Sequence, residues 1–159
     1  MNHRAFSNVT LSDLRPASSL FILGFRACAF GIPQCCRVQC SFNSGLGRDA
    51  DQALGDVLTF TRAISADGVR KIGLTAPGSD RMTRDEVSIV CVLSAAQAWD
   101  EVAVDVHLSG LLAGPVSPSL RALVTKIADT FAGHGLAFTA PAEVRQVSGA
   151  QTPSFHRLQ

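Results

Sequence analysis

Apolar residues recur with helical spacing in several stretches of this chain, most clearly near its C-terminal end. There the repeat consists of apolar residues three or four positions apart: Leu120, Leu123, Val124, Ile127 and Phe131. Such spacing places the side chains on one face of an α-helix. Ser117 is a typical N-cap, and Pro118 suits the first helical position. Gly133 is expected to supply the left-handed stop, which leaves His134 as a helix-end residue.

A second helix is predicted to begin at Thr83. A threonine followed three residues later by Glu86 fits a capping box, in which each side chain satisfies a backbone N–H of the first turn. Asp85 adds negative charge at the end where the helix dipole favours it. The residues that follow, Cys91 among them, are apolar on most sides, which is typical of a central helix. Trp99, at its end, is expected to pack into a helix junction.

The remaining segments are less uniform in pattern. Residues 49–65 carry one apolar stripe, and residues 18–30 form a shorter apolar stretch. Residues 100–114 are ambiguous, because valines at every second position suit a strand while other apolar pairs suit a helix. Asp100 as a cap favours the helix. Residues 66–78 are read as an extended connection or a short strand.

About five helices joined by short turns are therefore predicted, and the simplest burial of their apolar faces is against one another. We expect an all-α fold, a compact antiparallel bundle of about five helices, over residues 18–138. Residues 1–17 are polar and are expected to form a flexible leader. Residues 139–159 lack sustained periodicity and are expected to form a disordered tail.

Composition adds limits on size and partners. A chain of 159 residues is expected to form one domain with a core large enough to need no metal or disulfide for folding. Residues 1–48 contain five arginines against one acid, and residues 49–138 contain seven Lys or Arg against eleven acids. The arginines are scattered and form no basic run, so nucleic-acid binding is not expected.

The most apolar window also bears on location. Residues 20–30 are far shorter than the roughly 20 residues that span a bilayer, and Arg26 interrupts them. Asp13 upstream and Arg26 within the window argue against a secretory signal. We therefore expect a short buried helix, no membrane span and a cytoplasmic protein.

Four of the five cysteines lie between residues 28 and 40 and raise the question of a metal site or a redox switch. If Pro33 begins a helix, Cys36 and Cys40 share one of its faces and form half of a C-x3-C metal site. Cys28 with Cys35 is the only other half, and it fits poorly.

A reactive thiol is the second interpretation of this segment. Cys35 would be the third helical residue, where backbone N–H groups and Arg37 stabilise a thiolate, and a disulfide from Cys28 to Cys35 or Cys36 could respond to oxidation. Buried packing is favoured over both alternatives, because free cysteine behaves as a small apolar residue.

Other candidate chemistry is weaker. Residues 45–50 match the glycine pattern of a dinucleotide-binding turn, but no later alternation of strands and helices follows, so a turn between two helices is preferred. One set of polar residues has side chains suited to acid–base or metal chemistry: Asp80, Asp85, Glu86, Asp105 and His107. The sequence contains no H-E-x-x-H, G-x-S-x-G or Walker motif, so no catalytic set and no cofactor is expected.

From about Leu20 to Phe138 the chain resembles small uncharacterised helical proteins of proteobacteria. The resemblance rests on the polar helix start at residues 82–86, "MTRDE", and on the helix end at residues 132–138, "AGHGLAF". It implies a helical fold in a bacterial cytosol, and it assigns a role to no residue.

The sequence therefore favours a non-enzymatic interaction or regulatory module that binds a protein partner or itself. Its contact surface is expected on residues 20–30, which only Arg26 would solvate. The alternative is a thiol-based redox or metal sensor that uses one cluster of sulfurs: Cys28, Cys35, Cys36 and Cys40.

Overall fold

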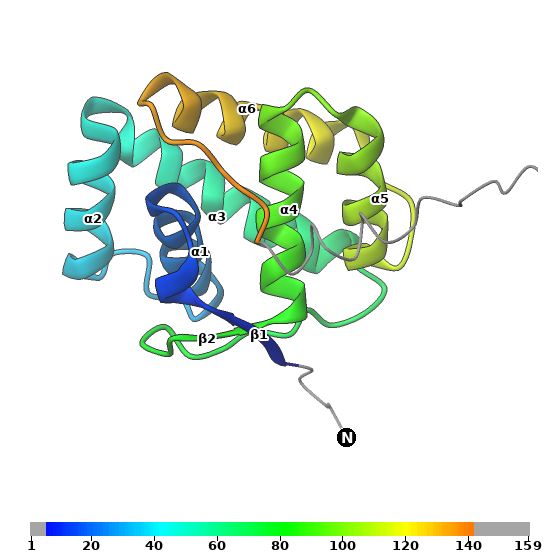
Figure 1. Cartoon of the computed structure of the whole chain (residues 1–159), viewed down its shortest axis with the longest axis horizontal. Helices are drawn as coiled ribbons and strands as arrows, with labels where there is room; N and C mark the ends of the chain where they lie inside the picture. Colours follow the sequence, from blue (N-terminus) through cyan, green and yellow to red (C-terminus); the bar gives the residue numbers. More distant parts are fainter. Residues whose placement is uncertain (1–5, 142–159) are drawn as a thin grey trace, which may run out of the picture.

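The chain folds into a mostly helical structure with one small sheet. Figure 1 shows the computed structural model, which describes residues 6–141. In chain order, the helices are α1 (Pro16–Ala29), α2 (Cys36–Leu46), α3 (Ala50–Asp67), α4 (Arg84–Gln97), α5 (Glu101–Leu112) and α6 (Pro118–Gly133). The two strands are β1 (Phe6–Thr10) and β2 (Arg81–Thr83), which pair antiparallel.

The helices are arranged in two groups that meet at the middle of the molecule. At one side α1 and α2 pack against α3, and at the other α4 packs against α5 and α6. The long helix α3 also contacts α6 and so joins the two groups. The ambiguous segment 100–114 is helical as α5, because Asp100 accepts a hydrogen bond from the N–H of Ala103 at 3.0 Å.

The sheet corrects the all-α prediction and the flexible leader. Residues 6–17, expected to be flexible, form β1, a short 3-10 helix η1 (Leu11–Asp13) and the first turn of α1. Phe6 pairs with Thr83 and Thr10 with Arg81, with an irregularity between the two pairs. A strand whose partner lies more than 70 residues away leaves no local periodicity to recognise. Residues 1–5 of the leader and 142–159 of the predicted tail lie outside the described residues.

The predicted caps of α4 and α6 are confirmed, apart from the glycine stop of α6. The Thr83 side chain accepts from the N–H of Glu86 at 3.1 Å, and the Glu86 carboxylate accepts from the N–H of Thr83 at 2.9 Å. The left-handed stop of α6 was expected at Gly133, but Gly133 is the last helical residue and Gly135 has the positive φ of 72°. The stop therefore lies two residues later than predicted.

Helix α1 lies in the core, so the expected contact surface on residues 20–30 is wrong. Phe21 and Ile22 are fully buried, and the ring of Phe21 lies 5.8 Å from that of Phe60 on α3. Arg26, expected to solvate this helix, is itself 0% exposed. The apolar window is therefore an interior helix that carries a buried charge.

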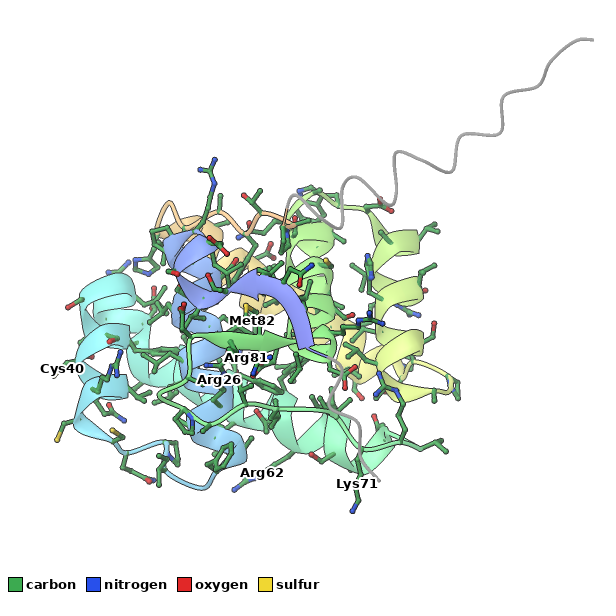
Figure 2. All side chains as sticks on the ribbon, turned by 60° about the horizontal axis from the view of Figure 1, so that its bottom comes forward. Arg26, Cys40, Arg62, Lys71, Arg81 and Met82 are labelled. Carbon is green, nitrogen blue, oxygen red and sulfur yellow. The ribbon has the colours of Figure 1, made fainter. Side chains whose placement is uncertain are left out.

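The buried guanidinium of Arg26 is held by Glu86 at the start of α4. Its Nε and Nη2 donate to the two carboxylate oxygens at 2.7 and 3.0 Å. Its remaining donors reach the backbone carbonyls of Ser79 at 2.6 Å and Arg81 at 2.8 Å, and Figure 2 shows Arg26 beside Arg81 at β2. The Thr75 hydroxyl also contacts Glu86. One carboxylate thus joins α1, the segment before β2 and the start of α4.

Two helical glycines give a matched test of this packing. A Cβ on Gly24 in α1 would lie 2.6 Å from Cζ of Phe42, a ring of α2 that is buried in the core. Gly24→Ala should therefore lower the free energy of unfolding by about 1–3 kcal/mol. A Cβ on Gly55 in α3 meets open space, so Gly55→Ala should raise that free energy by about 0.5–1 kcal/mol. Urea unfolding measures both, and equal effects of the two changes would contradict the close contact of α1 with α2.

Candidate functional site

The structure divides the cysteines into two classes. Cys28 and Cys91 are buried, and burial raises the pKa of each thiol to about 11; for Cys28 the charge of Arg62 opposes that rise in part. Both sulfurs are therefore protonated core atoms at neutral pH, as expected of buried cysteine.

The other three cysteines correct the expectation of buried packing: Cys35, Cys36 and Cys40 are exposed. Helix α2 begins at Cys36, and Cys35 is its N-cap, so Pro33 is not the first helical residue. The local reason is that the carbonyl of Ile32 accepts from the N–H of Cys35 in a turn that precedes the helix. Within residues 6–141, no three or more Cys, His, Asp or Glu side chains are grouped where they could hold a metal ion.

The glycine pattern at residues 45–50 is a turn between two helices, as preferred. The residues before it, which alternate like a strand in sequence, belong to helix α2. Gly47 has a φ of +50°, and a short 3-10 helix η2 (Gly47–Asp49) leads into α3. The strand required for a dinucleotide-binding turn is therefore replaced by a helix.

The acidic candidates are each engaged in a local structural contact. Asp85 accepts from Arg70 at 2.7 and 3.0 Å and from the N–H of Gly73 at 2.7 Å. Burial alone would raise the pKa of Asp85, but the hydrogen bonds from Arg70 and Gly73 outweigh it and lower that pKa. Asp105 accepts from Arg121 at 2.8 and 3.0 Å. These are cross-links between neighbouring segments.

The two remaining polar candidates also lie apart from one another. Asp80 accepts from the N–H of Ser12 at 3.0 Å and so fixes η1 beside the segment before β2. His107 lies on α5, where burial lowers the pKa of its ring and Asp100 opposes that shift. His134, expected only as a helix-end residue, forms a 2.7 Å contact with Asp49 and is the C-cap of α6.

The start of α5 presents an apolar surface to solvent. Trp99, expected in a helix junction, is 77% exposed, and Val102 and Val106 are 74% and 62% exposed. We call these three residues the α5 outer face. Val102 and Val106 lie one turn apart, on the side opposite the buried Val104 and Leu108. Figure 1 shows α5 at the edge of the molecule, at the far side from α2.

The signal for this face was present in the sequence. Apolar residues at every second position made segment 100–114 resemble a strand. In a helix, residues two apart point about 200° from each other, so the same alternation makes both faces apolar. One face of α5 packs on the protein, and the other contributes Val102 and Val106 to the surface.

Trp99 has an unusual backbone conformation for its type. The N–H of Asp100 donates to the carbonyl of Ala95 at 3.0 Å, and that of Trp99 donates to Ala96 at 3.2 Å. This is the hydrogen-bond pattern of a Schellman motif, in which the residue after the C-cap is left-handed and is usually glycine. Trp99 occupies that position with a φ of +58°.

Helix α6 ends with the same pattern and the usual residue. There the N–H of Leu136 donates to Phe131 and that of Gly135 donates to Ala132, both at 3.0 Å. Gly135 carries the positive φ without steric cost. At Trp99 the same conformation costs about 1–2 kcal/mol, and burial of the indole offsets little of it.

In comparisons with known proteins, the chain matches no protein-family model, no curated protein and no solved structure. Across the part of the chain that the structure describes, no helix is both long and apolar enough to cross a membrane.

The division of the cysteines predicts the course of a thiol titration. In the native protein an aromatic disulfide reagent should modify three thiols per chain quickly: Cys35, Cys36 and Cys40. Cys28 and Cys91 should react only after urea unfolds the chain, because they are buried and their raised pKa values keep them protonated. Mass spectrometry of the modified peptides identifies the sites, and early modification of Cys91 would contradict the central position of α4.

Proposed function

We propose that this chain is a non-enzymatic interaction module that pairs through the α5 outer face with a second copy of itself. The observation that carries the proposal is Trp99, an exposed indole at a backbone position where glycine would be less strained. A strained residue that folding does not need points to a role in binding. Tryptophan is also among the residues most enriched at the energetic centres of interfaces.

The polar residues support a non-enzymatic role. The carboxylates that sequence analysis singled out serve the fold: Glu86 holds Arg26, Asp85 holds Arg70, and Asp105 holds Arg121. Each of these carboxylates accepts hydrogen bonds from an arginine on another segment and so fixes one segment against another. Their spacing over separate elements supports structural roles for them.

Charge favours a second copy in antiparallel orientation. Asp100 and Glu101 both lie at the N-terminal end of α5, where Asp100 is the N-cap. A two-fold axis across α5 would keep the acids of the two copies at opposite ends of the interface and join the apolar residues between them. Parallel pairing would bring four acids together. An isologous interface of this kind is the commonest arrangement of homodimers.

A thiol sensor is the second candidate, and the exposure of Cys35, Cys36 and Cys40 favours it. Cys36 and Cys40 lie one turn apart on α2, and Cys28 is separated from them by burial. Elemental analysis of protein purified under reducing conditions tests it, together with the redox dependence of the thiol titration. Absence of bound metal and of any reversible oxidation would eliminate it.

The cytoplasmic location and the antiparallel-bundle arrangement stay predictions of the sequence.

Replacement of Trp99 separates binding from folding. Trp99→Gly should abolish self-association, because it removes the centre of the α5 outer face. It should also raise the free energy of unfolding of the monomer by about 1 kcal/mol, because glycine accepts the left-handed conformation. Sedimentation velocity over a range of concentrations measures the first effect, and urea unfolding of dilute protein measures the second.

Two controls make the result specific. Phe30→Ser removes another exposed aromatic side chain, at the end of α1, and should leave self-association unchanged. Trp99 is the only tryptophan of the chain, so its fluorescence should shift to shorter wavelength as wild-type protein associates. A wild-type monomer at every concentration, or a dimer in which Trp99 emission does not move, would contradict pairing through α5. Capture of a different helical protein by the same face would replace the second copy as the occupant.

A further inference from the structure

A groove of about 1010 Å³ opens between the end of α1, the second half of α3 and the segment that follows α3. Apolar side chains from all three segments line it. Phe25, Cys28 and Ile64 are buried beneath its surface. Leu58, Ile72 and Leu74 are partly exposed and form its apolar floor. The groove is of the size that holds small molecules in proteins.

Basic side chains line the same groove. Arg62 comes from α3, and Arg70 and Lys71 come from the segment after it. Figure 2 shows Arg62 and Lys71 projecting from one edge of the molecule. Arg70 is neutralised by Asp85, whereas no ion pair engages Arg62 or Lys71 among the described residues. Two uncompensated positive charges therefore stand beside an apolar floor.

The absence of acids from the groove contrasts with its surroundings. Residues 49–138 contain eleven acids against seven Lys or Arg, and most of the groove belongs to this range. No Asp or Glu is among the residues that line it. The local potential is therefore positive within an acidic part of the chain, and a positive cleft with apolar walls concentrates anions.

Exposed apolar residues border the groove. Val69 lines it and is 80% exposed. Phe30 and Ile32 are also exposed, and they belong to the turn that contributes Gly31 and Pro33 to its wall. Water therefore contacts apolar surface on two sides of the cations. A ligand that combines an alkyl chain with a negative charge would cover the exposed apolar surface and neutralise the cations.

We propose that this groove binds a free amphiphile with a single apolar chain and an anionic head group, a phosphate monoester or a carboxylate. The head group is held by Arg62 and Lys71, and the alkyl chain lies over Leu58, Ile72 and Leu74. A purely polar anion would leave the apolar floor in contact with water. An uncharged alkyl compound would leave the two cations uncompensated. The arrangement matches one molecule that carries both chemistries. Arg62 and Lys71 take no part in the α5 outer face, so the two proposals fail independently.

Titration calorimetry of the full chain tests the groove with decyl phosphate as the probe, kept below the concentration at which it aggregates. Decyl phosphate and decanoate should bind, and inorganic phosphate and decanol should each bind at least about tenfold more weakly, because each supplies one half of the recognition. Arg62→Glu and Lys71→Glu should each lower the affinity for decyl phosphate by about tenfold or more. Arg48→Glu, an exposed charge change in η2 outside the groove, should leave the affinity unchanged.

A second variant tests the groove without changing charge. Ser65→Trp, on the exposed side of α3, would fill the space that the ligand's alkyl chain occupies. It should therefore weaken the binding of decyl phosphate and of decanoate, and circular dichroism should show an unchanged fold. Equal affinity of inorganic phosphate and decyl phosphate would overturn the proposal. So would affinities that Arg62→Glu, Lys71→Glu and Ser65→Trp leave unchanged. Binding to vesicles of anionic phospholipid without binding of the free probe would show a membrane surface instead, and would also overturn it.

Discussion

The buried ion pair between Arg26 and Glu86 is the interaction on which the rest of this structure depends. Both side chains are 0% exposed, so each charge is stable in the interior only because the other is present. The same Glu86 carboxylate completes the capping box of α4 and contacts Thr75. Arg26 in turn uses its remaining donors on the carbonyls of Ser79 and Arg81. The pair therefore fixes α1, β2 and the start of α4 in one arrangement.

The sequence was sufficient to predict half of this network. The capping box follows from Thr83 and Glu86 three residues apart, and the structure confirms it. Arg26 was expected to lie in solvent, because an arginine within an apolar window is usually exposed and its partner lies 60 residues away. β1 was missed for the same reason, since the residues with which it pairs are distant in sequence. Local periodicity predicts helices and caps, whereas contacts between distant segments need the folded chain.

The two candidate surfaces differ in how far the sequence could reveal them. The valines of the α5 outer face follow from the alternation at residues 102–108 once that segment is known to be helical. The exposure of Trp99 did not follow from the sequence, which favoured a packed helix junction. The groove is assembled from α1, α3 and residues 68–74, so no single stretch of sequence contains it. The exposed cysteines were misjudged for two reasons. Cys35 precedes α2, because the helix begins later than Pro33 suggested. Cys36 and Cys40 lie on the side of α2 opposite the face that it buries, which consists of Val38, Phe42 and Leu46.

A double-mutant cycle at Arg26 and Glu86 tests the central claim most directly. Arg26→Met, Glu86→Gln and the double variant are compared with wild type by urea unfolding, and the coupling energy is obtained from the four free energies. Arg26→Met alone should cost about 3–5 kcal/mol, because it leaves a buried carboxylate unpaired. The double variant should be more stable than Arg26→Met alone, because glutamine removes that charge and keeps an oxygen for the N–H of Thr83. Strictly additive losses, with a coupling energy near zero, would contradict a buried pair that holds the fold together.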